Sequence, residues 1–151
     1  MAEWTAADLP SFHGRTVVIT GANSGLGAVV ARELARVGAD VVMAVRNTGK
    51  GEEAAQQMSG SVDVRELDLQ DLASVQKFAD GVERVDVLIN NAGIMAVPYA
   101  QTVDGFESQI GTNPLGHFAL ANLLLPRLTD RIVTVSSMVH WRGAIDVDDL
   151  N

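Results

Sequence analysis

A glycine-rich stretch carries the clearest chemistry in this chain: Thr20-Gly21-Ala22-Asn23-Ser24-Gly25-Leu26-Gly27. It follows the apolar, β-branched run 16–19 and precedes a helical pattern of apolar residues, so we expect it to turn from a strand into a helix. Glycines let the backbone turn sharply and come close to a pyrophosphate, and the first amide groups of a helix are free to bind an anion. The stretch therefore predicts a dinucleotide phosphate site. Its Gly-x-x-x-Gly-x-Gly spacing differs from the common Gly-x-Gly-x-x-Gly fingerprint, and a plain glycine-rich turn is the alternative.

Polar residues also follow the other predicted strands. The carboxyl ends of parallel strands lie along one edge of a sheet, and ligands bind at that edge. A parallel sheet would therefore bring these polar residues into one binding site. The residues that follow the successive strands are Gly21, Arg46, Asp68, Asn90 and Ser136.

The elements that must position these residues alternate between strands and helices. Apolar runs predict strands at 15–20, 40–45, 62–67, 85–89 and 131–135. Helical spacing of apolar residues predicts helices at 26–37, 52–58, 71–82, 103–110 and 115–128. This alternation predicts an α/β fold, a doubly wound parallel sheet (Rossmann-like) with strand order 3-2-1-4-5. We interpret residues 1–151 as a single domain.

Composition argues against several other classes of protein. The chain of 151 residues has a formal net charge of −8 and no basic stripe, so we expect no nucleic-acid partner. It has no apolar run of about 18 residues and no apolar block near its start, so neither a membrane span nor a signal peptide is predicted. Cysteine is absent, which excludes disulfides and thiolate ligands and fits a cytoplasmic location. No metal site is predicted.

Together these residues resemble the short-chain dehydrogenase/reductase family, from Arg15 to about His140. The glycine-rich stretch is similar to that family's cofactor loop, and Asn90-Asn91-Ala92-Gly93 is similar to its motif after strand four. Asn113 with Gly116 matches its asparagine motif, and Ser136-Ser137 matches the stretch that carries its catalytic serine. The regions 46–52 and 136–140 look most like the retinol-dehydrogenase-like branch of the family.

The resemblance implies hydride transfer between a nicotinamide dinucleotide and a small alcohol or carbonyl substrate. It implies that Ser137 hydrogen-bonds the substrate oxygen and that Asn113 is a second catalytic residue. Residues after the first, third and fourth strands would contact the pyrophosphate, the adenine and the nicotinamide ribose. They are Gly21, Asn23, Ser24, Gly25, Leu26, Gly27, Asp68, Leu69, Asn90, Ala92 and Gly93. The alternatives are a simple turn for the asparagine pair and a helix-entry carboxylate for Asp68.

The charge after the second strand indicates which dinucleotide is bound. An NAD site typically places a carboxylate about 20 residues past the glycines, where it binds the ribose 2′-hydroxyl. Here Val45 is followed by Arg46, whose guanidinium is suited to clamp a 2′-phosphate. We therefore expect NADP(H) rather than NAD(H). The alternative is that Arg46 is a solvated surface residue.

Two features depart from the family pattern. The family's Tyr-x-x-x-Lys pair, which supplies the catalytic acid, is absent, because the single tyrosine is Tyr99 and the lysines are Lys50 and Lys77. Pro114 removes a backbone donor and is expected to push Asn113 away from helical dihedrals, which argues against a catalytic role for Asn113.

We therefore interpret the chain as the amino-terminal, cofactor-binding part of the family domain, without the carboxyl-terminal part and inactive by itself. The alternatives are a non-catalytic NADP-binding module and a truncated product. The strand at 131–135 would then form an unprotected sheet edge, so self-association into a homo-oligomer is expected.

Overall fold

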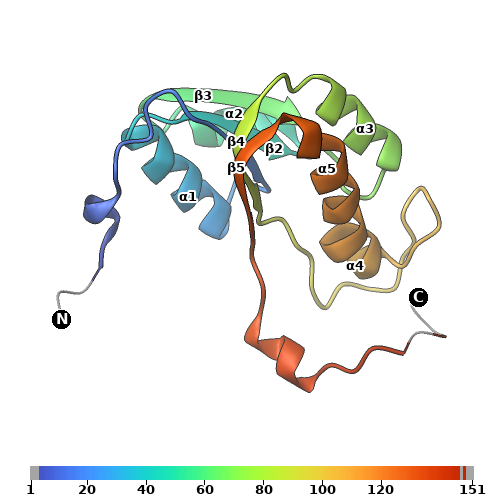
Figure 1. Ribbon diagram of the computed structural model, residues 1–151. Coiled ribbons are helices and arrows are strands. Elements are labelled where there is room, and N and C mark those ends of the chain that lie inside the picture. Colours follow the sequence, from blue (N-terminus) through green and yellow to red (C-terminus); the bar gives the residue numbers. More distant parts are fainter. Residues whose placement is uncertain (1–3, 147, 149–151) are drawn as a thin grey trace.

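The fold is built on one parallel sheet of five strands (Figure 1). The computed structural model describes residues 4–146 and 148. The strands are β1 (Thr16–Thr20), β2 (Asp40–Val45), β3 (Ser61–Glu66), β4 (Val85–Asn90) and β5 (Leu128–Thr134). They lie in the order β3-β2-β1-β4-β5, and each neighbouring pair is parallel. The predicted strand order is confirmed.

Helices connect the strands and cover both faces of the sheet. The α-helices are α1 (Gly25–Arg36), α2 (Thr48–Ala55), α3 (Leu72–Asp80), α4 (Ser108–Ile110) and α5 (His117–Leu124). The remaining helical segments are η1 (Ala6–Asp8), η2 (Gly111–Gly116, a π-helix), η3 (Leu125–Arg127) and η4 (Met138–Arg142). Among the described residues, no helix is long and apolar enough to cross a membrane.

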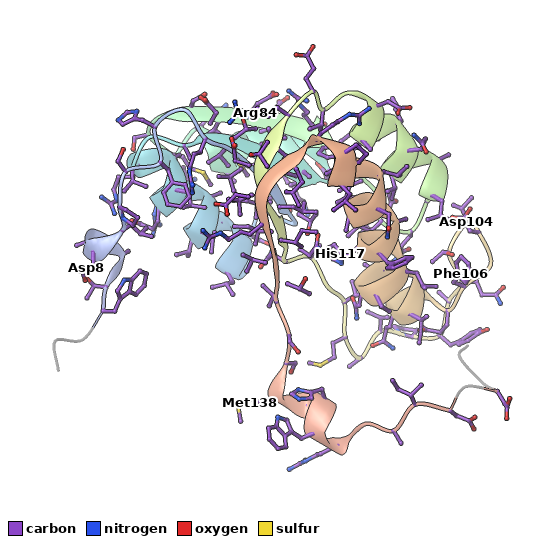
Figure 2. All side chains as sticks on the ribbon, viewed as in Figure 1. Asp8, Arg84, Asp104, Phe106, His117 and Met138 are labelled. Atoms are coloured by element: carbon purple, nitrogen blue, oxygen red, sulfur yellow. The ribbon has the colours of Figure 1, made fainter. Side chains whose placement is uncertain are left out.

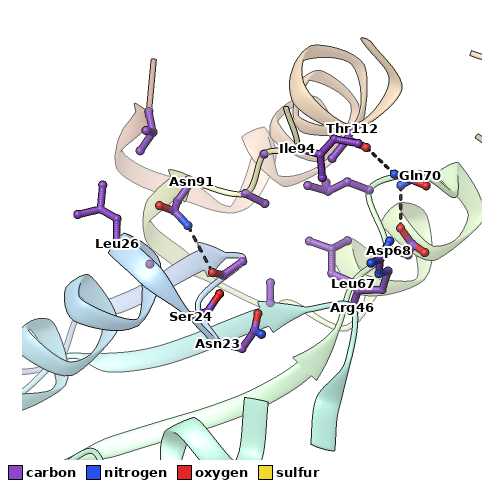
Figure 3. A pocket seen from close by; sticks show the side chains of 17 residues that line it. Asn23, Ser24, Leu26, Arg46, Leu67, Asp68, Gln70, Asn91, Ile94 and Thr112 are labelled. Carbon is purple, nitrogen blue, oxygen red and sulfur yellow. Dashed lines mark hydrogen bonds between the residues drawn. The ribbon is translucent and has the colours of Figure 1, made fainter. Parts of the chain in front are cut away.

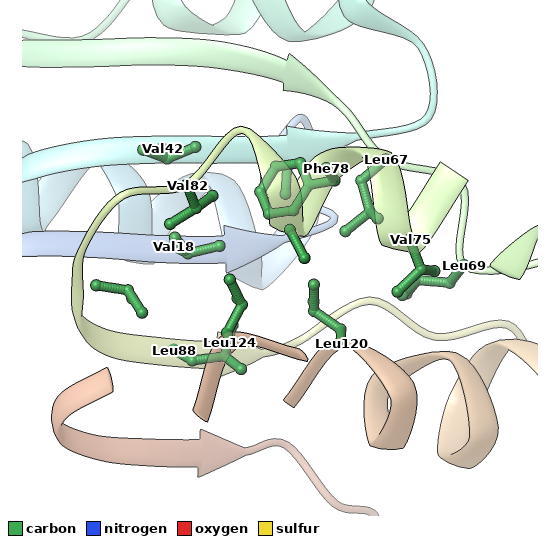
Figure 4. Packing of buried hydrophobic residues seen from close by; sticks show 13 residues of the cluster. Val18, Val42, Leu67, Leu69, Val75, Phe78, Val82, Leu88, Leu120 and Leu124 are labelled. Atoms are coloured by element: carbon green, nitrogen blue, oxygen red, sulfur yellow. The ribbon is translucent and has the colours of Figure 1, made fainter. Parts of the chain in front are cut away.

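Two apolar cores lie on opposite faces of the sheet. On one face, Val18 and Leu88 pack with Phe78 of α3 and with Leu120 and Leu124 of α5 (Figure 4). The core on the other face contains residues of β1, β2, α1 and α2, including Ile19, Met43, Leu34 and Ala54. Adjacent residues of β1 thus serve different cores, which is why its apolar run is continuous rather than alternating.

The helix predicted at 103–110 is largely wrong, since only α4 forms there. Gly105 has a φ of 86° and its amide donates to the Thr102 carbonyl, which closes a turn instead of a helix. The Asp104 carboxylate accepts a hydrogen bond from the Leu72 amide at 2.9 Å. The start of this segment therefore supports α3, and Glu107 caps the short helix that follows.

The long helix predicted at 115–128 is divided in the structure. The chain passes from η2 through α5 to η3, and β5 begins at Leu128, three residues before the predicted start. Pro126 lies at the beginning of η3, where its missing amide donor ends the α-helical ladder. The expectation that Pro114 excludes Asn113 from a helix is also wrong. Both residues lie within η2, because the wider π-helical turn accommodates a proline.

A buried carboxylate fastens the amino-terminal end of the sheet. Asp86 accepts hydrogen bonds from the Thr16 amide and the Arg84 guanidinium at 2.8 Å each, and from the Thr129 hydroxyl. Its side chain is 6% exposed. Burial raises the pKa of Asp86, but the hydrogen bonds outweigh that effect and lower the pKa from 3.8 to about 2. This one side chain thus joins β1, β4 and the start of β5.

Replacing Asp86 by Asn should destabilise the fold in a pH-dependent way. The folded-state pKa lies below the unfolded value, so the stabilisation is complete above pH 3.8 and is lost as the pH falls to about 2. We expect Asp86→Asn to lower the free energy of unfolding by about 1–2 kcal/mol at pH 7. Urea unfolding of both proteins between pH 7 and pH 2 would measure this. A difference that stays constant down to pH 2 would contradict the assignment.

The sheet ends at β5, which carries apolar side chains on an accessible surface. Ile132 is 38% exposed and Val133 is 42% exposed. Beyond β5 the chain leaves the sheet and runs through η4, where Met138 stands apart from the core (Figures 1 and 2). An exposed strand of this kind favours pairing with another chain, and self-association stays a prediction.

Candidate functional site

A cavity of about 470 Å³ opens at the carboxyl ends of the strands (Figure 3). Residues that follow each of the five strands contribute to its wall, as expected for the binding edge of a doubly wound sheet. They are Gly21, Asn23, Ser24, Leu26, Gly27, Ala44, Arg46, Leu67, Asp68, Leu69, Gln70, Asn91, Ala92, Gly93, Ile94, Thr112 and Val135. Ten of the predicted cofactor residues are in this set; Gly25 and Asn90 are not.

The glycine turn is tightly packed as well as open to a ligand. A Cβ atom at Gly27 would lie 2.6 Å from the Gly21 carbonyl oxygen and 2.5 Å from the side-chain nitrogen Nδ2 of Asn91. Gly21 has a φ of 65°, and a Cβ there would lie 3.0 Å from Ala92. Glycine is therefore needed for the packing of α1 against the turn after β4, in addition to any approach of a phosphate.

The hydroxyl of Thr20 joins the ends of β1 and β4. It accepts hydrogen bonds from the Asn91 and Ala92 amides, each at 2.9 Å. The Asn91 side chain in turn donates to the Thr20 carbonyl at 2.8 Å, so the contact is reciprocal. The two strand ends, and with them the glycine turn, are therefore held at a fixed separation.

Sequence reasoning selected Asn90 where the cavity has Asn91. Asn90 is the last residue of β4 and is 5% exposed, so its side chain is enclosed by the sheet rather than by the cavity. Asn91 is the first residue beyond the strand and lines the cavity. The alternation of side chains along a strand could have distinguished the two, had the end of β4 been placed one residue later.

The wall opposite the glycine turn is formed after β3. The Asp68 carboxylate accepts from the Gln70 amide at 2.9 Å, and the Gln70 side chain donates to the Thr112 hydroxyl at 3.0 Å. Leu69 is buried beneath them. Gln70 and Thr112 were not predicted as site residues, because only the π-helical path of η2 brings Thr112 to this wall.

Two cations face the region beside the glycine turn. Arg46 lines the first cavity, and Lys50 lines a second one of about 550 Å³ between α1 and α2. Asn23 and Ser24 line both, so the two hollows are neighbours. In the described part of the chain, neither Arg46 nor Lys50 forms an ion pair, whereas Arg32 at the second hollow is paired with Glu33. The positive charges of Arg46 and Lys50 are therefore available to an anion.

The two predicted catalytic residues lie outside the cavity lining. Ser137 is exposed and accepts a hydrogen bond from the Val139 amide at 3.2 Å, as the cap of η4. Asn113 makes two 2.9 Å hydrogen bonds with the backbone of Ile94, one as donor and one as acceptor. In this structure, Asn113 supports the turn after β4.

The doubly wound sheet and the glycine turn at its switch point define a Rossmann-like dinucleotide-binding fold. The sequence profile of the short chain dehydrogenase family matches residues 15–146. The chain belongs to the short-chain dehydrogenase/reductase family. Human retinol dehydrogenase 13 is 48% identical to it over 91% of this chain and 46% of its own. The chain spans about half the length of the curated relatives it matches.

Solved structures show the same similarity. An uncharacterised protein from Mycobacterium paratuberculosis is 79% identical, with a TM-score of 0.97 over 99% of this chain and 56% of its own. The RhlG/NADP complex of Pseudomonas aeruginosa has a TM-score of 0.75 at 26% sequence identity, over 90% of this chain and 59% of its own. A short-chain dehydrogenase/reductase from Burkholderia phymatum in complex with NAD has a TM-score of 0.74 at 26% sequence identity, over 87% of this chain and 52% of its own. Relatives thus bind either dinucleotide.

A single methyl group at Gly27 should close the site. We expect Gly27→Ala to reduce dinucleotide affinity at least tenfold, because the new Cβ displaces either the Gly21 carbonyl or the Asn91 side chain. Fluorescence titration with NADPH would measure it, and circular dichroism would show whether the variant is folded. Gly81→Ala is the matched control, since a Cβ there would lie 3.5 Å from the Phe78 carbonyl oxygen, an ordinary van der Waals contact. Unchanged affinity in a folded Gly27→Ala variant would mean that the loop is only a turn.

Proposed function

We propose that this chain binds NADP(H) in the cavity at the carboxyl edge of the sheet. It would be the cofactor-binding part of an oxidoreductase that transfers a hydride between NADP(H) and an alcohol or carbonyl carbon. The observation that carries the choice of cofactor is the charge beside the glycine turn. Arg46 follows β2 directly and has no ion-pair partner among the described residues, and no carboxylate occupies that position.

The cavity residues fit the parts of a dinucleotide. The pyrophosphate would lie against the glycine turn and the first turn of α1, where Ser24 caps the helix without a side-chain hydrogen bond to it. Asp68 and Leu69 would contact the adenine, and Ala92 and Gly93 the nicotinamide ribose. Asn90 would support this turn indirectly, because it is the last residue of β4, the strand from which the turn begins.

Electrostatics favour the phosphorylated dinucleotide. Relatives are solved with NADP and with NAD, so the choice for this chain rests on its own charges. Arg46 supplies a planar guanidinium suited to a phosphate, and Lys50, four residues further along in the first turn of α2, adds a second positive charge. The 2′-phosphate would lie between them, beside Asn23 and Ser24 at the junction of the two hollows.

The chain holds part of the machinery for hydride transfer. When bound, the nicotinamide ring supplies or accepts the hydride. Ser137 would hydrogen-bond the substrate oxygen, from the segment just beyond Val135 of the cavity wall. Among the described residues no acid is placed to protonate that oxygen, since Tyr99 is exposed and has no lysine four residues later.

The cofactor assignment predicts a selective loss of affinity. Arg46→Ala should weaken NADPH binding by about 10- to 150-fold, the value of a charge-assisted hydrogen bond, and leave NADH binding nearly unchanged. Lys77→Ala on α3 is the control, because it removes one positive charge at a residue that does not line the cavity. Titrations with both dinucleotides would measure the effect. Equal losses for NADPH and NADH would refute the 2′-phosphate assignment.

The 151-residue chain by itself should bind NADPH without turning it over. General acid–base catalysis contributes roughly 10²–10⁴-fold, and the part of the chain that the structure describes offers no positioned acid. NADPH consumption at 340 nm with a panel of aldehydes and ketones, using chain freed of host reductases, would test this. Turnover above the blank that disappears in Ser137→Ala would show that another residue supplies the proton.

A further inference from the structure

One buried titratable side chain lies directly behind the candidate cofactor site. His117, at the start of α5, is 5% exposed and contacts Thr20 at the carboxyl end of β1. Its Nε2 lies 2.8 Å from the Thr20 hydroxyl, and its Nδ1 lies 2.8 Å from the Asn113 carbonyl oxygen. The imidazole thus bridges the end of β1 and the π-helix η2.

The partners determine which nitrogen carries the proton. The Asn113 carbonyl can only accept, so Nδ1 of His117 donates to it. Burial lowers the pKa of His117, and the hydrogen bond to Asn113 offsets only part of that effect, so the ring is neutral and Nε2 is an acceptor. The Thr20 hydroxyl therefore donates to Nε2. Its oxygen is left free to accept from the Asn91 and Ala92 amides.

These bonds form a closed circuit around the cavity floor. From Thr20 the circuit passes to Asn91 and Ala92, continues along the chain to Ile94, crosses to Asn113 and returns through His117. Without the imidazole, the acceptor left to the Thr20 hydroxyl among the described residues is the Ile89 carbonyl at 3.5 Å, which is too long for a strong hydrogen bond. The orientation of that hydroxyl thus depends on His117.

We propose that His117 is a positioning residue for the dinucleotide site. By accepting a hydrogen bond from the Thr20 hydroxyl, His117 orients that hydroxyl so that its oxygen accepts from the Asn91 and Ala92 amides. It thereby sets the separation between the glycine turn and the turn after β4. This inference rests on the proposed function for its consequence in NADP(H) binding. The hydrogen bonds from His117 through Thr20 to Asn91 and Ala92, which we call the clamp, are present in the chain without ligand.

Conservative variants separate this role from general stabilisation. His117→Gln places an amide near the position of Nε2 and should keep the contact with Thr20, whereas His117→Asn places one near Nδ1 and should lose it. We expect NADPH affinity to fall about fivefold in His117→Asn, the value of one hydrogen bond, and less than twofold in His117→Gln. His13→Phe, at the opposite end of the sheet, is the control for histidine replacement.

A double-mutant cycle tests whether His117 acts through Thr20. Thr20→Val should weaken NADPH binding about tenfold or more, because two amides lose their acceptor. Adding His117→Asn to Thr20→Val should cause no further loss if both belong to one interaction. Independent effects, in which the double variant is about fivefold weaker again, would overturn the proposal.

Hydrogen exchange of the unliganded chain distinguishes failure of this inference from failure of the proposed function. Mass spectrometry should show faster exchange in the peptide covering 90–94 for His117→Asn but not for His117→Gln. If the wild-type chain does not bind NADPH, the proposed function fails, and the exchange result decides the clamp. Equal exchange in all three proteins, or equal affinity where binding occurs, would overturn the role of His117.

Discussion

The close junction between β1 and β4 is the constraint on which the rest of the site depends. At this point the strand order reverses, and a sheet of this kind opens a crevice for a ligand there. The crevice keeps its shape only if α1 can begin against the turn after β4. Gly27 permits that approach, because any side chain would overlap the Gly21 carbonyl or the Asn91 amide. The same absence of a side chain leaves the helix amides accessible to an anion.

Local dipoles and single charges explain how an acidic chain could hold a dinucleotide with several phosphate charges. The formal net charge of −8 would repel such a ligand at long range. Over a few ångströms, however, the start of α1 and the side chains of Arg46 and Lys50 present positive charge on one side of the crevice. Asp68 follows β3, the strand beside β2, and so lies near Arg46 on the cavity wall (Figure 3), where one of its oxygens accepts a hydrogen bond from the Gln70 amide.

Buried polar groups stabilise the sheet at both of its ends. At the amino end, the ionised Asp86 gathers β1, β4 and β5 through charge-assisted hydrogen bonds. At the carboxyl end, the neutral His117 and the Thr20 hydroxyl join β1, the turn after β4 and η2 without a charge, beside a cavity where a fixed charge would affect the ligand. The separation leaves the electrostatics of the cavity to Arg46, Asp68 and the start of α1, with Lys50 in the neighbouring hollow. Such networks specify one register of the strands as well as adding stability.

The sequence by itself determined the strand order, the edge at which the site lies and most of the cavity wall. The strand order, the edge and the glycine turn follow from short-range rules, since apolar runs mark buried strands and glycines mark the turn. Most of the remaining wall residues were expected from the resemblance to the family. The helix boundaries between 103 and 128 were mistaken, because Gly105, Pro114 and Pro126 act there through a turn, a π-helix and a 3₁₀ segment. Only the tertiary structure placed Asn91 rather than Asn90 in the cavity, and only it brought Thr112 and His117 to the site. Those contacts join residues 42 to 97 positions apart, and they depend on how α5 packs across the sheet, which no local pattern encodes.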